Sequence, residues 1–274
     1  MQVRPFPIDR LDRSVPRHWL AGSMLATHLA NGVSVLFPAG ERFFVRSVKH
    51  FASAFEGDPE LAEAVRKFAG QEGWHAGAHD RHIKMLEEQG YAIRPFLRVY
   101  ERFCYGFLEK AFSPKLRLSA TVAAEHFTAV MAENFLDEGF ERGIHPVMLD
   151  LLSWHAAEEI EHRAVAFEVL KRVDDGYALR VAGLALAGSV LAAFWVAGTL
   201  TLLAQEKGVV RATRREGKEV AQRMPFGERV FGRGIRTYLR RDFHPLHDRH
   251  LDAMAERILR GYAAAAAPVH PASV

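Results

Sequence analysis

The sequence predicts an all-α protein, and three observations carry this prediction. Apolar residues recur at intervals of three and four over long stretches, whereas few stretches show the period of two that marks a β-strand. Helix start and stop signals occur in pairs, with Asp58-Pro59 opening and Gly90 closing one long stretch. With 274 residues, of which 49% are hydrophobic and 25% charged, the chain can bury a large core.

In chain order, the first element is an irregular arm over residues 1–16, which lacks the apolar segment of a secretory signal. The apolar run 19–37 is interrupted by Asn31-Gly32, and its structure is left open. Capping signals and breaks then predict helices over 38–55, 58–90, 93–112, 113–143, 145–174 and 251–262. Residues 263–274 are expected to form a loose tail. A single cysteine, Cys104, excludes an internal disulfide.

A further helix is expected over residues 181–204, a run of 24 residues without a charge. This exceeds the roughly 20 residues needed to cross a bilayer, and Gly183 and Ala187 have the small-residue spacing of transmembrane packing faces. Residues 205–250 hold 12 Lys and Arg against 6 Asp and Glu, as the cytoplasmic flank of a membrane segment does. The sequence favours contact with a membrane on its cytoplasmic side through 181–204, and a core helix buried on all sides is the alternative.

The most informative stretch is residues 154–162. His155, Glu159 and His162 lie at i, i+4 and i+7 of a predicted helix, so they project from one face, which neighbouring apolar residues also share. Burying these groups costs free energy unless something binds them. Neutral His and ionised Glu suit divalent iron, manganese or zinc, so a metal site is the hypothesis and a solvated stripe is the alternative. Glu158 and Glu161 point off this face and are expected to be exposed or to support a ligand.

A second copy of the Glu-x-x-His pair lies upstream at Glu72 and His75, and two other predicted helices carry the carboxylates Glu41 and Glu125. One Glu from each of two helices plus a Glu-x-x-His pair from each of the other two is the inventory of a dinuclear site in a four-helix bundle. His79, one turn after His75, is an additional ligand or a residue that supports one. The predicted metal ligands are Glu41, Glu72, His75, Glu125, His155, Glu159 and His162.

This ligand order resembles that of the ferritin-like di-iron superfamily, which includes oxygenases, desaturases and ribonucleotide reductase subunits. The third histidine makes the site similar to those of the arylamine N-oxygenases. The motifs FPAGERFF at 37–44, QExxHxxxH at 71–79, EExEH at 158–162 and FHP at 243–245 resemble the bacterial family of predicted metal-dependent hydrolases, over roughly residues 20–250. The resemblance implies a ferritin-like four-helix bundle with extra helices and two iron ions, with manganese or zinc as alternatives.

Two activities are consistent with this resemblance. The first is activation of O2 by a non-haem di-iron centre, with an external electron donor, to oxidise a hydrophobic substrate such as a lipid. The second is hydrolysis by a dinuclear site that lowers the pKa of a bound water. A non-enzymatic iron store or membrane scaffold is a third class. Residues 93–112 and 181–204 are the expected walls of an apolar substrate pocket.

The predicted organisation has three segments. Residues 1–176 form the metal-binding bundle, 177–204 an apolar helix in the membrane or the core, and 205–274 a basic helical region packed on the bundle. No recognition motif accompanies the basic residues, so no nucleic-acid partner is expected. The expected partners are O2, an electron donor, a hydrophobic small molecule and membrane lipid, and a homodimer is left open.

Overall fold

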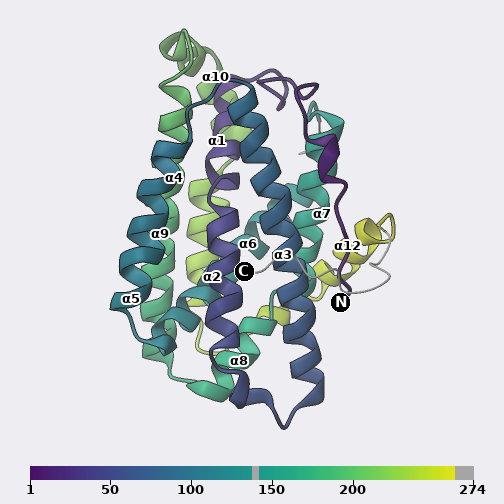
Figure 1. The fold of residues 1–274 in the computed structure, drawn as a ribbon, viewed down its shortest axis with the longest axis vertical. Helices are drawn as coiled ribbons and strands as arrows, with labels where there is room; N and C mark the ends of the chain where they lie inside the picture. Colours follow the sequence, from purple (N-terminus) through teal and green to yellow (C-terminus); the bar gives the residue numbers. More distant parts are fainter. Residues whose placement is uncertain (138–141, 263–274) are drawn as a thin grey trace.

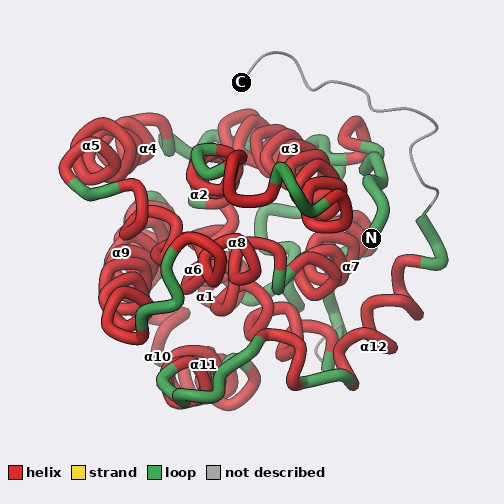
Figure 2. Tube along the Cα trace, turned by 90° about the horizontal axis from the view of Figure 1, so that it is seen from below, coloured by secondary structure: helices red, strands yellow, loops and turns green. Residues whose placement is uncertain are grey.

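The computed structural model describes residues 1–137 and 142–262, so the expected tail 263–274 lies outside the described residues. The prediction of an all-α fold with one long apolar helix is confirmed (Figure 2). Within the described residues the β-type pairing consists of one isolated bridge between Leu20 and Ile144. Helices packed side by side therefore provide every long element that positions the site.

Four helices carry the predicted ligands: α2 (Phe37–Lys49), α3 (Pro59–Glu88), α6 (Pro114–Leu136) and α7 (Pro146–His162). Asp58 caps α3 by accepting a hydrogen bond from the Leu61 amide, and Ser113 caps α6 in the same way through the Leu116 amide. A proline in the first turn of each helix removes an amide that would otherwise lack a partner. The four helices lie side by side in the body of the molecule (Figure 1).

Several predicted boundaries differ from the structure. The run left open at 19–37 contains α1 (Met24–Ser34), which leads directly into α2. The helix expected over 113–143 ends at Leu136, and the one expected over 145–174 is broken between α7 and α8 (Val165–Val173). The stretch expected as one helix over 93–112 is divided into α4 (Arg94–Glu101), the π-helix η3 (Arg102–Leu108) and the short α5 (Glu109–Ala111).

The apolar helix α9 (Tyr177–Leu203) packs against α1 and α6, and α4 lies beside it (Figure 1). Its glycines face the protein: a Cβ on Gly183 would lie 2.1 Å from Ser119 Oγ on α6, and one on Gly198 would lie 3.1 Å from the Gly32 carbonyl on α1. The small residues therefore allow close packing inside this chain. The alternative of a helix buried on all sides is wrong, because one stripe of α9 is exposed: Ala178, Ala182, Ala185, Ser189, Ala193, Val196 and Leu200.

By length and composition α9 is the one helix in the described residues that could cross a membrane. Beside it, the α4–η3 segment also exposes large apolar side chains, with Val99 63% and Phe107 61% exposed. Such exposed apolar groups are uncommon in contiguous patches on soluble monomers. Two neighbouring elements, α9 and the α4–η3 segment, therefore carry exposed apolar side chains.

The remaining helices pack around the bundle. The α10 helix (Val209–Arg223) contacts α1, α11 (Arg233–Tyr238) contacts α6, and α12 (His250–Leu259) contacts α7. Short elements complete the order: η1 (Ile8–Arg10), η2 (Ala52–Phe55), η4 (Phe226–Gly232) and η5 (Pro245–His247). The N-terminal arm runs along α3 and α7, where Arg4 and Gln2 reach the site. The division into three segments at 176 and 204 stays a prediction.

Candidate metal centre

The structure brings all seven predicted ligands together in the bundle interior. They form two clusters in which the ligand atoms lie within 4.8 Å of one another. The Glu41 group consists of Glu41, His75, His155 and Glu159, and the Glu72 group consists of Glu72, Glu125 and His162. Each helix contributes because its ligands occupy one face: Glu72 and His75 are separated by one turn on α3, as Glu159 and His162 are on α7.

Glu159 connects the two groups. Its Oε1 lies 2.8 Å from His155 Nε2 and 3.4 Å from His75 Nδ1, both in the Glu41 group. Its Oε2 lies 3.6 Å from His162 Nε2, in the Glu72 group. One carboxylate therefore faces both positions, as a carboxylate that bridges two metal ions does.

The site fits metal ions because most of its buried ligand atoms lack hydrogen-bond partners among the described residues. The exceptions are His155 Nε2 and Glu159 Oε1, which contact each other. Both carboxylate oxygens of Glu41, Glu72 and Glu125 are buried and unpaired, as are His75 Nδ1 and His162 Nε2. Buried polar atoms are normally hydrogen-bonded, because leaving one unpaired costs about 1–3 kcal/mol. These atoms converge on two points, and two divalent cations would balance the charge of the four carboxylates.

The pKa values of the predicted ligands reflect the same excess of buried negative charge. Burial and then repulsion from Glu72 raise the pKa of Glu41 well above its usual value, and burial raises that of Glu125 to about 8. Burial alone would lower the pKa of His75, but contacts with the Glu158 and Glu159 carboxylates raise it to about 10. Without metal, the centre therefore retains protons that a bound cation would displace.

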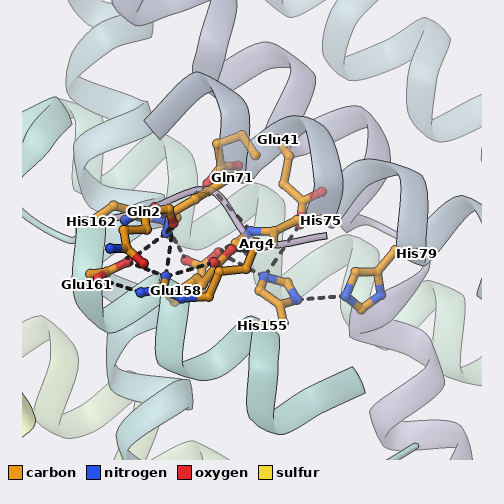
Figure 3. A network of polar contacts seen from close by, with 12 residues as sticks. Gln2, Arg4, Glu41, Gln71, His75, His79, His155, Glu158, Glu161 and His162 are labelled. Carbon is orange, nitrogen blue, oxygen red and sulfur yellow. Dashed lines mark hydrogen bonds and ion pairs between the residues drawn. The ribbon is translucent and has the colours of Figure 1, made fainter. Parts of the chain in front are cut away.

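Each predicted histidine ligand is held through the ring nitrogen that does not face the centre (Figure 3). His75 Nε2 lies 3.0 Å from Glu158 Oε2, and His162 Nδ1 lies 3.1 Å from Gln71 Oε1. His155 Nδ1 lies 2.6 Å from His79 Nε2. Such contacts fix the tautomer and the ring orientation of a ligating histidine.

Contacts from the N-terminal arm reinforce this outer layer. Arg4 Nη1 donates to Glu158 Oε1 at 3.1 Å and to Glu161 Oε2 at 2.9 Å (Figure 3). Glu158 is fully buried and supports His75, which agrees with the second of the two alternatives expected for it and not with exposure. Gln71 joins the same network by donating to Glu161 Oε2 at 2.7 Å. The roles of Arg4 and Gln71 could not be predicted from the sequence, because no local pattern reveals that the arm folds back onto α7.

His79 belongs to a hydrogen-bonded chain that leads away from the Glu41 group. Its Nδ1 lies 2.8 Å from Ser34 Oγ, which lies 2.7 Å from His82 Nδ1. Burial lowers the pKa of His79 well below its usual value and that of His82 to about 4. The geometry thus places His79 behind His155, where a neutral ring accepts the Nδ1 proton and supports the ligand.

A third cluster of metal-ligating residue types, missed from the sequence, lies at the end of the bundle and contrasts with the centre. His18 Nε2 and His28 Nε2 lie 3.0 and 3.1 Å from the same oxygen of Glu206, Oε1. Tyr91 donates to this oxygen as well. Hydrogen bonds within the cluster therefore satisfy Glu206 Oε1, whereas Glu41, Glu72 and Glu125 in the centre have no hydrogen-bond partner among the described residues.

Two apolar cavities reach the centre, both at the Glu41 group. The Arg117 cavity, of about 120 Å³, lies between α2, α6, α9 and the α4–η3 segment and extends from Glu41 to Arg117. The Trp19 cavity, of about 110 Å³, lies between α1, α6 and α7 and reaches His155 and Glu159. Neither of these two cavities is lined by a member of the Glu72 group.

The fold and the clustered ligands define a helical-bundle protein with a candidate dinuclear metal centre. A family model described as a predicted metal-dependent hydrolase matches residues 2–248, so the chain belongs to that family. The resemblance stated from the motifs is thereby confirmed. No curated protein and no solved structure matches the chain.

Proposed function

We propose that the protein is a non-haem di-iron oxidoreductase that uses O2 to oxidise a hydrophobic substrate. One observation carries the proposal: the cavities that reach the Glu41 group are lined almost wholly by hydrocarbon. A pocket of this kind holds an apolar molecule and excludes bulk water from the reacting position. Oxidation of an apolar molecule needs no water as a reactant, whereas hydrolysis does.

Two iron ions, when bound, supply electrons in pairs for the reduction of O2. Reduction of O2 takes four electrons, of which the substrate gives two and an external donor gives two. The chain's own contribution is position and charge. Glu41, Glu72, Glu125 and Glu159 supply negative charge, Glu159 spans both ion positions, and His79, Glu158 and Gln71 fix the three histidine rings.

The exposed apolar side chains of α9 and the α4–η3 segment support a substrate drawn from a membrane. Other residues of the same two elements line the Arg117 cavity. A lipid substrate could enter there without crossing water. We therefore extend the proposal to membrane association through these two elements, with the basic residues of 205–250 attracted to anionic lipid.

Metal-dependent hydrolysis is the second candidate, because the description of the family names it. Two adjacent metal ions lower the pKa of a bound water and clamp the bond that is cleaved. The ligand set of carboxylates and imidazoles also suits manganese or zinc. This activity would need water and a cleavable ester or amide at the Glu41 group.

The test is metal content per chain after anaerobic purification, followed by O2 uptake on addition of a chemical reductant. We expect about two irons per chain and reductant-dependent O2 consumption that increases with a hydrophobic substrate. The Glu133→Gln variant is the control, since Glu133 lies on α6 but pairs with Arg233 outside the centre. Glu125→Gln, the same change within the centre, should lose iron and O2 uptake.

Other outcomes would decide against the proposal. Zinc or manganese with ester cleavage that proceeds without O2 would establish the hydrolase instead. Many irons per chain in a large assembly would indicate storage.

A further inference from the structure

The two cavities at the Glu41 group adjoin each other at two shared lining residues. Phe37 and Thr128 line both the Arg117 cavity and the Trp19 cavity. The Phe37 ring lies 4.8 Å from the His155 ring and 4.9 Å from the His79 ring, centroid to centroid. One aromatic side chain therefore stands between two apolar spaces at the point where both meet the metal ligands.

The Arg117 cavity extends along α6. Arg117, Ala120, Ala124 and Thr128 line it from α6 at helical spacing, so they form one stripe along the helix. At about 1.5 Å of rise per residue, this stripe is roughly 16 Å long from Arg117 to Thr128. Small alanine side chains in its middle leave room for a chain that lies along α6.

Apart from Glu41 at the metal centre, the polar side chains that line the Arg117 cavity are satisfied by the protein except at the opposite end. The hydroxyls of Tyr100 and Tyr105 lie 2.6 Å apart, and Thr128 Oγ1 donates to the Glu125 carbonyl at 2.9 Å. Arg117 Nε is buried and has no hydrogen-bond partner among the described residues, while Arg117 Nη1 donates to the Glu109 carbonyl. A cation with an unused donor thus lies at the end of the cavity away from the metal ligands.

An anion at this end is favoured for two reasons. A guanidinium forms strong charge-assisted hydrogen bonds with carboxylates. Arg117 also lies in the second turn of α6, near the end of the helix that attracts negative charge. The nearby carboxylate of Glu109 does not compete for Arg117, because Arg46 donates to both of its oxygens at 3.2 and 2.8 Å.

We propose that the two cavities form one binding site for a single long, unbranched fatty acid, whose carboxylate contacts Arg117 and whose chain passes the Glu41 group at Phe37. The far end of the chain occupies the Trp19 cavity after the Phe37 ring rotates aside. The reacting carbon atoms are then internal methylenes rather than the carboxylate. The identity of the reacting carbons rests on the proposed oxidoreductase function, whereas binding of the chain does not.

The test measures binding of hexadecanoate, hexadecan-1-ol and octanoate to the purified full-length protein, with and without metal, by displacement of a fluorescent fatty acid. We expect hexadecanoate to bind best. Arg117→Gln should weaken hexadecanoate binding about tenfold or more and leave hexadecan-1-ol unchanged. Lys115→Gln is the matched control, because Lys115 lies two residues away on α6 and pairs with Asp174 at the surface. Lys115→Gln should bind hexadecanoate and hexadecan-1-ol as the unchanged protein does.

Two filling variants test whether the cavities act together. Ala124→Phe fills the Arg117 cavity and should abolish binding of both acids. Ala30→Phe fills the Trp19 cavity and should weaken hexadecanoate while leaving octanoate unchanged. Circular dichroism and thermal unfolding establish that each variant folds, and Ala124→Leu and Ala30→Leu serve as milder versions.

Failure of this inference can be told apart from failure of the proposed function. Absence of fatty-acid binding, or equal loss of acid and alcohol in Arg117→Gln, overturns the inference whatever the metal does. If Ala30→Phe weakens hexadecanoate and octanoate binding equally, the proposal that one chain occupies both cavities is overturned. Binding without any O2 uptake would instead refute the proposed oxidoreductase function and leave the fatty-acid site supported.

Comparison of free hexadecanoate with hexadecanoate in phosphatidylcholine vesicles shows whether the acid comes from solution or from a membrane. Phospholipid binding with no free-acid binding overturns the proposal.

Discussion

The two ligand groups of the centre differ in access and in chemistry. The Glu41 group has two histidines, adjoins both apolar cavities and is supported by the His79–Ser34–His82 chain. The Glu72 group has one histidine and two carboxylates, and the Phe68 ring packs 5.0 Å from His162. The two positions therefore differ in their surroundings: the Glu41 group faces the apolar cavities, and neither of these cavities reaches the Glu72 group.

The largest expected effect comes from removing Glu159, which belongs to the Glu41 group and also faces the Glu72 group. Glu159→Ala should lower metal content from about two ions per chain to nearly none, because Glu159 faces both positions. The helix should survive, since alanine is a good helix former. Glu133→Ala on α6 should keep both ions. Metal analysis with circular dichroism provides the measurement, and retention of two ions in Glu159→Ala would contradict the assignment.

A smaller effect is expected when each group loses its own histidine. His155→Ala should lose the ion of the Glu41 group, and His162→Ala should lose the ion of the Glu72 group. Each variant should therefore keep about one ion per chain. The ion that remains in His155→Ala should be removed more slowly by a chelator, because neither cavity reaches the Glu72 group. His126→Ala is the control, since His126 is buried but its Nε2 contacts the Gly234 carbonyl. Equal chelation rates in the two variants would remove the distinction between the groups.

The smallest expected effect is the pH dependence of the stability of the metal-free protein. Burial raises the pKa of Glu125 to about 8, and carboxylate contacts raise that of His75 to about 10 against the effect of burial. In the unfolded chain these groups release their protons near pH 4.5 and 6.5, so the folded state binds more protons. The Glu125 contribution to stability is therefore lost between about pH 4.5 and 8, and the His75 contribution between about pH 6.5 and 10. Both decrease together as pH rises from about 6.5 to 8.

We expect the melting temperature of the metal-free protein to fall by several degrees over this range, as a change of about 1–2 kcal/mol would produce. The metal-loaded protein should not show this fall, because bound cations replace the protons. Glu125→Gln should reduce the pH dependence of the metal-free form. A melting temperature that rises with pH in the metal-free protein would show that the centre does not hold these protons.

The ligand positions could be predicted from the sequence because helical periodicity is local. The spacing of Glu72 with His75, and of Glu159 with His162, fixes a common face wherever the helix goes. The metal-binding role of the seven residues stays a prediction, although their convergence and unpaired atoms fit it. The all-α class and the long apolar helix followed from the same local patterns.

Long-range contacts could not be predicted in this way. The arm residue Arg4 contacts Glu158, which lies 154 positions away, and nothing near Arg4 in the sequence indicates this partner. The glycines of α9 have the same spacing whether they face lipid or another helix of this chain, so Gly183 could not be matched to Ser119 beforehand. The π-helix η3 and the break between α7 and α8 also depend on packing.

The contact between Arg4 and Glu158 also sets an order for biosynthesis. Arg4 leaves the ribosome long before Glu158 is made, so the support for His75 cannot be completed until nearly all of α7 has emerged. Pairing across such a large sequence separation is slow to form, and it comes after the local helices. A purification tag placed before residue 1 would lie beside α7 and could disturb the contact between Arg4 and Glu158. A tag at the other end of the chain is therefore the better choice for any metal measurement.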